Sequence, residues 1–384
     1  MRILHTADWH LGKIVNNVYM TEDQQYILER FIEIVQEQHP DVIIIAGDLY
    51  DRSIPPKQAV ELLNHTLTRL INDLNIPVLA ISGNHDSPDR LEFGSKLFRK
   101  QGFYLDTKLS KDYEAVTLND EVGPVHFHLI PYVEPAEVAY MLEDPSIKTH
   151  QQATERLIEF IMRQYEPTER HVWIGHAFIA GGMESESEER LSMIGGTPYV
   201  DASLFEQFSY VALGHLHQSQ KIKRDSVRYS GSILKYSFSE ANHNKSVTLV
   251  DLKDDGSCDI EKIPLIPKRD FEVVEGYFSN LLEGQSSQNP NNYLHIRLLD
   301  DGQILDPMGK LRKVYPNILH LERVAFSPSK QKEDLQELKS RQKLAPFDLF
   351  TAFYKDIKGD DLPEQRKELI QTAIEELRSK ERGK

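Results

Sequence analysis

The N-terminal part of the chain alternates between short continuous apolar runs and segments whose apolar side chains recur at helical spacing. Val42–Ile45 and Pro77–Ile81 are apolar runs of β-strand length, and Arg2–Thr6 reads as a buried strand before them. The intervening segments, around residues 27–35 and 59–71, carry apolar residues on one face each, which predicts two amphipathic helices. This strand–helix order predicts an α/β fold in which the strands form a layered sheet.

The pattern continues less regularly to residue 266, which we take as the end of a first domain, 1–266. Further strands are predicted at Val125–Ile130, His171–Phe178, Tyr210–Leu213, Val227–Tyr229, Ser246–Lys253 and Asp259–Leu265, and a helix at Gln151–Tyr165. A glycine-containing, acidic loop at Ala180–Pro198 lies between two of these strands. It is either plain surface or a lid beside a site.

Beyond Pro267 the pattern changes. Residues 267–328 predict a small α+β domain with strands at Tyr293–Leu299 and Ile318–Phe326 and a helix at Pro307–Val314. Residues 329–384 predict a helical tail with two apolar stripes. The first stripe consists of Leu349, Phe350, Phe353 and Ile357, and the second of Leu369, Ile370, Ala373, Ile374 and Leu377.

The chain has 384 residues, of which 40% are hydrophobic, so it can bury a sizeable core. The one cysteine, Cys258, excludes an intramolecular disulfide and fits a reduced, cytoplasmic compartment. The start of the chain does not resemble a signal peptide, and no apolar run approaches the roughly 20 residues that cross a bilayer. The formal net charge of −15 argues against coating nucleic acid by bulk charge, but not against an enzyme that acts on DNA.

Clusters of carboxylate, imidazole and amide side chains follow the predicted strands at their carboxyl ends. In chain order they are Asp8-x-His10, Gly47-Asp48-x-x-Asp51, Gly83-Asn84-His85-Asp86, Gly175-His176 and Gly214-His215-x-His217. Ligands of layered α/β sheets bind beyond the carboxyl ends of the strands, so we expect these side chains to gather at one site.

The residue types in these clusters suit Mn²⁺, Fe²⁺ or Zn²⁺, and the lack of a thiolate argues against a closed structural zinc site. An aspartate can bridge two ions about 3.5–4 Å apart. Two ions so held would lower the pKa of a shared water and stabilise a phosphate in its transition state. The sequence therefore predicts two-metal hydrolysis of phosphoesters.

The ordered clusters resemble the calcineurin-like metallophosphoesterase superfamily, which implies a layered β-sandwich flanked by helices. The blocks HTADWHLG, GDLYD and SGNHDS more closely resemble the SbcD family, the nuclease subunits of SbcC–SbcD complexes that process DNA ends. The predicted small domain, as a DNA-capping module, and the helical tail also match the layout of that family.

The resemblance implies a role for each motif residue. One ion would be held by Asp8, His10, Asp48 and His217, and the other by Asp48, Asn84, His176 and His215. His85 would lie over the scissile phosphate and stabilise developing charge, and Asp51 would orient His85 through a hydrogen bond. The spacing to His176 is unconstrained, so another histidine is the alternative at that position.

The resemblance also implies a manganese-dependent DNA nuclease that serves DNA repair, recombination and replication in the cytoplasm, associated with the nucleoid. Its activities would be 3′→5′ exonuclease on duplex ends and endonuclease on single strands or hairpins. The partner would be the ATPase SbcC, bound to the tail, and two subunits would pair within a heterotetramer. An alternative for the tail is that its helices cover the core of their own chain.

The sequence also offers candidate residues for contact with DNA and with SbcC. Candidates for DNA contact are Arg52, Arg90, Lys221, Lys223 and Arg224. Candidates for SbcC contact are Leu349, Phe350, Phe353, Leu369, Ile370, Ile374 and Leu377. Two other functions stay open: a phosphatase or phosphodiesterase acting on a small molecule or protein, and a DNA-end tether without catalysis.

Overall fold

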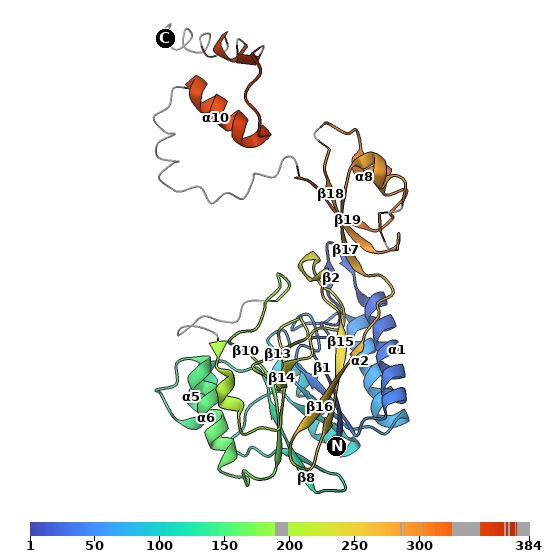
Figure 1. The fold of residues 1–384 in the computed structure, drawn as a ribbon. Coiled ribbons are helices and arrows are strands. Elements are labelled where there is room, and N and C mark those ends of the chain that lie inside the picture. Colours follow the sequence, from blue (N-terminus) through green and yellow to red (C-terminus); the bar gives the residue numbers. More distant parts are fainter. Residues whose placement is uncertain are drawn as a thin grey trace. The chain divides into compact units, whose positions relative to one another are not determined.

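The computed structural model describes residues 1–188, 199–284, 286–287, 289–300, 302–324, 346–364, 366–367, 369–372 and 374. It divides into two compact units, Met1–Phe271 and Glu272–Lys384 (Figure 1). Ala373 and Leu377 of the second apolar stripe, the side chain of Ile357, and residues 189–198 of the acidic loop lie outside the described residues.

The first unit is built on two six-stranded sheets. The first sheet has the order β16 (Cys258–Pro264), β15 (Ser246–Leu252), β1 (Arg2–Thr6), β4 (Val42–Ala46), β5 (Val78–Ile81) and β6 (Phe103–Asp106). The second has the order β13 (Gln220–Ile222), β14 (Arg224–Tyr229), β12 (Tyr210–Gly214), β9 (Arg170–His176), β8 (Pro124–Ile130) and β7 (Val116–Asn119). The four strands from β1 to β6 in the first sheet, and the four from β14 to β8 in the second, run parallel. In the first sheet β15 pairs antiparallel with both β1 and β16, and in the second sheet β13 and β7 add an antiparallel strand at each edge.

A shared apolar core joins the two sheets. Alternate residues of β4, such as Ile44, pack with residues of the second sheet such as Val172 and Ala212. The intervening residues Ile43 and Ile45 are also fully buried, because helices cover the outer face of this sheet. The result is a β-sandwich flanked by helices, which confirms the predicted fold class.

Helices α1 (Thr21–Gln38) and α2 (Lys57–Thr68) lie along one side of the unit, and α5 (Pro135–Leu142) and α6 (His150–Met162) along the other (Figure 1). Helix α6 begins where Thr149 and Gln152 form a reciprocal capping box, and it packs on the outer face of the second sheet. The shorter elements are β2 (Ile14–Val15), β3 (Val18–Tyr19), η1 (Arg69–Asp73), α3 (Pro88–Leu91), α4 (Ser95–Phe98), η2 (Arg99–Gln101), β10 (Phe178–Ile179), β11 (Tyr199–Val200), η3 (Ala202–Phe205) and η4 (Phe238–Glu240).

The second unit contains the three-stranded sheet β17 (Phe271–Gly276), β18 (Tyr293–Leu298) and β19 (Ile318–Arg323), with helices α7 (Phe278–Leu281) and α8 (Pro307–Leu311). It has its own apolar core, which includes Ile296 and Tyr315. Helix α10 (Pro346–Lys358) follows, and Leu349, Phe350 and Phe353 on it are exposed, as is Leu369 beyond it. None of the helices in the described part of the chain combines the length and apolar character needed to cross a membrane.

Candidate metal centre

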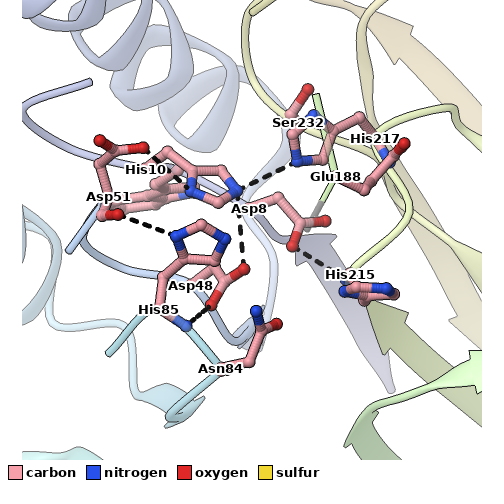
Figure 2. Close-up of polar contacts among 12 residues, drawn as sticks. Asp8, His10, Asp48, Asp51, Asn84, His85, Glu188, His215, His217 and Ser232 are labelled. Atoms are coloured by element: carbon pink, nitrogen blue, oxygen red, sulfur yellow. Dashed lines mark hydrogen bonds and ion pairs between the residues drawn. The ribbon is translucent and has the colours of Figure 1, made fainter. Parts of the chain in front are cut away.

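The parallel strands of both sheets end at a common edge, and the motif residues follow them there (Figure 2). Asp8, Asp48 and Asn84 come from the first sheet, whereas His176 and His215 come from the second. The side chains singled out from the sequence therefore lie together, and the site straddles the two layers of the sandwich.

Asp48 lies at the middle of this group. Its Oδ2 atom is 3.6 Å from Nε2 of His10 and 3.3 Å from Nε2 of His176. His176 Nε2 also lies 3.0 Å from Oδ1 of Asn84, while its Nδ1 is 3.0 Å from the carbonyl oxygen of Ala46. The carbonyl thus directs Nε2 toward Asp48 and Asn84.

The other side of the group is formed by His10, His217 and Asp8. The Nε2 atoms of His10 and His217 are 3.0 Å apart, and Oδ1 of Asp8 accepts a hydrogen bond of 2.9 Å from the backbone N–H of His215. Oδ2 of Asp8 and Nδ1 of His10 are buried and have no hydrogen-bond partner among the described residues. A buried carboxylate oxygen in this state costs free energy unless a cation meets it.

Burial dominates the electrostatics of the site. It raises the pKa of Asp8 to about 7 and lowers the pKa of His10 and His215 well below the usual range. Burial acts to raise the pKa of Asp48, but the neighbouring His176 holds it well below its usual range. Burial acts to lower the pKa of His176, but Asp48 outweighs it and raises that pKa to about 9. Carboxylates and imidazoles so crowded and desolvated form a site suited to a cation.

The backbone at the strand ends is strained. Four non-glycine residues of the site have positive φ: Asp8 at 52°, His10 at 45°, Asp48 at 51° and His215 at 102°. Such conformations cost about 1–3 kcal/mol each and cluster at functional sites. Close packing adds to this, because a Cβ on Gly214 would lie 1.9 Å from the carbonyl oxygen of Ala46.

His85 and Asp51 lie beside this group. The backbone N–H of His85 donates to Oδ1 of Asp48 at 3.0 Å, and its Nδ1 is 2.8 Å from the carbonyl oxygen of Asp51. The Asp51 carboxylate instead accepts from Nζ of Lys13 at 2.7 Å. Asp86 does not face the group but accepts from the backbone N–H of Leu49, Tyr50 and Gly83, so it holds the two loops together.

Two sets of ligand atoms have the spacing of metal sites, with all atoms of a set within 4.8 Å of one another. They are Asp8, Asp48 and His176, and His10, Asp51 and His85. The donors are carboxylate and imidazole, which Mn²⁺, Fe²⁺ and Zn²⁺ accept in proteins. The residues therefore fit a metal centre that takes more than one ion.

The candidate DNA-contacting residues are dispersed. Lys221 and Lys223 form ion pairs of 2.8 Å with Asp225 and Asp201, and Arg224 donates to the carbonyl oxygens of Phe205 and Phe208. Arg52 is half-exposed and has Nη2 3.9 Å from Oδ2 of Asp51, so it lies at the rim of the site. Arg90 is exposed on the short helix α3.

Sequence reasoning missed several residues around the site, among them Lys13, Ser187, Glu240 and Lys245. Lys13 directly follows the HTADWHLG block, so the sequence itself indicates that Lys13 lies near the motif. Glu240 and Lys245 are buried charged residues with no motif around them. Their roles depend on contacts with His217, which the sequence pattern around each residue does not predict.

Comparisons with known proteins show the family to which the chain belongs. Residues 1–219 match the family model of the calcineurin-like phosphoesterases, and residues 267–358 match the type 5 capsule protein repressor C-terminal domain. The Thermus thermophilus protein TT1561 aligns with 69% of this chain and 99% of its own at 13% identity and a TM-score of 0.41.

Two curated proteins are similar over nearly the whole chain. The SbcD subunit of nuclease SbcCD from Staphylococcus saprophyticus is 40% identical over 386 residues, covering 99% of this chain and 100% of that protein. Its counterpart in Staphylococcus epidermidis is 38% identical over 371 residues, covering 96% and 97%. The resemblance inferred from the motifs is thereby confirmed, and the chain belongs to the SbcD family of SbcCD nuclease subunits, within the calcineurin-like phosphoesterases.

Proposed function

We propose that this chain is the nuclease subunit of a DNA-end-processing complex and hydrolyses phosphodiester bonds of DNA with two divalent metal ions. The observation that carries the proposal is the position of Asp48, whose Oδ2 atom lies between His10 and His176. A carboxylate so placed can serve two ions at once. The full-length similarity to proteins named as nucleases supports DNA as the substrate.

The proposed ligands are the two sets named from the sequence. Asp8, His10, Asp48 and His217 would hold one ion, and Asp48, Asn84, His176 and His215 the other. The buried, unpartnered Oδ2 of Asp8 and the 3.3 Å contact between His176 and Asp48 support this assignment. When bound, a pair of ions, for which we propose Mn²⁺, would neutralise phosphate charge and make water a better nucleophile at neutral pH.

His85 acts on the substrate in this proposal and binds no metal. Nδ1–H donates to the carbonyl oxygen of Asp51, so in the imidazolium form of the ring, which carries a proton on both nitrogens, Nε2–H is the group that would contact the scissile phosphate. There it stabilises negative charge as it develops and can give a proton to the leaving oxygen. Asp51 positions His85 through its main chain, and its carboxylate pairs with Lys13.

The resemblance to the SbcD family also supports proposals about the specific nuclease activities and the partners. We propose 3′→5′ exonuclease activity on duplex ends and endonuclease activity on single strands and hairpins, for DNA repair, recombination and replication in the cytoplasm. Residues 1–266 would form the nuclease domain and residues 267–328 a DNA-capping domain. The tail, 329–384, would bind the ATPase SbcC, which the exposure of Leu349, Phe350 and Phe353 supports. Pairing of two subunits is supported by exposed apolar residues such as Phe93 and Leu97.

The test is a gel assay of the purified chain on end-labelled duplex and hairpin DNA. It is run with Mn²⁺, with Mg²⁺ and with EDTA, and with the His85→Ala variant in parallel. Manganese-dependent cleavage that the variant lacks is the expected result. Hydrolysis of a small phosphodiester without cleavage of DNA, even after the ATPase partner is added, would contradict the proposal and favour a small-molecule phosphodiesterase.

A further inference from the structure

A buried acid–base pair lies behind His217, on the side away from His10. Glu240 is fully buried and accepts hydrogen bonds from Nζ of Lys245 and from the backbone N–H of Tyr236. A carboxylate removed from water is costly unless it is paired, and here Lys245 supplies the pairing charge. Neither residue belongs to the motifs or takes part in the proposed reaction.

Glu240 and Lys245 each contact His217. Oε1 of Glu240 lies 3.3 Å from Nδ1 of the His217 ring, and Nζ of Lys245 donates to the His217 carbonyl oxygen at 2.7 Å. The ring and the main chain of one residue are thus both fixed by the same ion pair. The opposite nitrogen of the ring, Nε2, is the atom that lies 3.0 Å from His10 (Figure 2).

Ser187 joins this network from the acidic loop. Its hydroxyl oxygen is 2.9 Å from Nδ1 of His217 and donates to Glu240 at 2.5 Å. Because that hydroxyl gives its hydrogen to the carboxylate, it accepts from Nδ1–H of the imidazole. The proton of His217 therefore sits on Nδ1, and the Nε2 lone pair faces the site.

We propose that Glu240 is a positioning residue for metal binding, which holds His217 in the tautomer and orientation that present Nε2 to an ion shared with Asp8 and His10. This inference rests on the proposed function, since it takes His217 as a metal ligand. Carboxylates behind metal-binding histidines fix the ring and raise its basicity, and their loss typically costs about 10–100-fold in metal affinity.

The test is titration of Mn²⁺ into metal-free protein by calorimetry, with the Glu240→Gln variant, which keeps the side-chain shape and removes the charge. We expect one of two Mn²⁺ equivalents to bind about 10–100-fold more weakly and the other to bind as in the wild type. Because Glu240→Gln leaves the Lys245 charge buried without its partner, the double variant Glu240→Gln/Lys245→Met is tested too. It removes both charges and allows the measurement if the single variant does not fold.

Asp120→Asn is the matched control. Asp120, directly after β7, pairs with the buried Arg170 through two hydrogen bonds of 2.7 and 2.8 Å, and Arg170 begins β9 at the opposite end of that strand from His176. This variant should lose thermal stability while both Mn²⁺ equivalents bind normally. A merely structural role for Glu240 would give the same result as this control.

A double-mutant cycle decides whether Glu240 acts through His217. His217→Ala should weaken the same equivalent, and adding Glu240→Gln to it should weaken that equivalent no further. Unchanged binding in Glu240→Gln, or equal weakening of both equivalents, overturns the inference while wild-type DNA cleavage stands. If the wild-type protein itself binds no Mn²⁺ and cleaves no DNA, the proposed function is overturned, and not only the role of Glu240.

Discussion

The Nε2 atoms of His10 and His217 lie 3.0 Å apart, although 207 positions separate the two residues in the sequence. Both rings are buried, and the short distance leaves no room for a water molecule between the two nitrogens. Two neutral imidazoles at this distance fit together only if the N–H of one donates a hydrogen bond to the lone pair of the other. A cation bound by both nitrogens would replace that contact with a stronger one.

Metal ions should therefore stabilise the folded protein. At a Mn²⁺ concentration one hundred times the Kd of a site, the expected gain in the free energy of unfolding is about 2.7 kcal/mol for that site. Differential scanning calorimetry should show a higher Tm with Mn²⁺ and reversal by EDTA. Asp48→Asn should largely abolish the increase, and an equal increase in that variant would argue against Asp48 as a shared ligand.

His85→Asn should separate binding from chemistry. Because its side chain belongs to neither proposed ligand set, the variant should bind two Mn²⁺ equivalents and bind DNA. Cleavage should fall by about 10²–10⁴-fold, the usual contribution of a positioned acid or base. Rates near the wild-type value on end-labelled duplex DNA would exclude His85 from the chemical step.

Asp51→Asn should be milder than the His85 variants. The hydrogen bond between the two residues uses the carbonyl oxygen of Asp51, which the substitution keeps, and the carboxylate pairs with Lys13. We expect a loss of cleavage well below the about 10²–10⁴-fold expected at His85. The comparison is made in one gel series, and Lys13→Met serves as the control that removes the other half of the ion pair. A loss as large as that of His85→Asn would assign the carboxylate itself to the reaction.

Gly214→Ala should disrupt the junction of the two sheets. Its Cβ would lie 1.9 Å from the Ala46 carbonyl oxygen and 2.9 Å from Nδ1 of His176, so main chain must move. Overpacking of this kind costs typically about 1–3 kcal/mol, and metal binding should weaken as well. Gly302→Ala is the control, because a Cβ there meets no atom within 4 Å. Urea unfolding and Mn²⁺ titration of both variants give the comparison.

The buried His128 should make the protein sensitive to acid. Burial lowers its pKa to about 3, against 6.5 in the unfolded chain, and its Nε2 contacts Nδ1 of His171 at 3.1 Å. Between these pH values the unfolded state binds the extra proton, so the free energy of unfolding falls as pH decreases from 6.5 toward 3. The slope is about 1.4 kcal/mol per pH unit for this one group. His128→Phe should reduce the slope in urea titrations at about pH 4 to 7, and an unchanged slope would contradict the argument.

Much of the first unit could be predicted from the sequence, for a physical reason. Strands β4 and β5 are buried on both faces, so each reads as a continuous apolar run. Strand β1 is also buried, and the motif residues directly follow all three strands. These motif residues lie close together because neighbouring parallel strands end at the same edge of a sheet. The residues assigned as ligands were brought together in this way, and their role in metal binding stays a prediction.

Other features depend on contacts that the local pattern does not contain. Strands β6 and β7 lie at sheet edges and carry mixed side chains, so periodicity did not indicate them. The predicted strand His171–Phe178 is wrong in extent, because β9 ends at His176 and Phe178 pairs with a separate short strand. Glu240 has a role only through its contact with His217, which no helical or strand spacing reveals.

The division of the site between two sheets has a consequence for protein synthesis. A chain whose translation has reached residue 170 contains Asp8, Asp48 and Asn84, but neither His176 nor His215. The strands that carry these two histidines follow later and must pack against the first sheet before the group is complete. A chain on the ribosome that has not yet reached His215 therefore cannot assemble the centre, so synthesis of the second sheet must precede the ability to cut DNA.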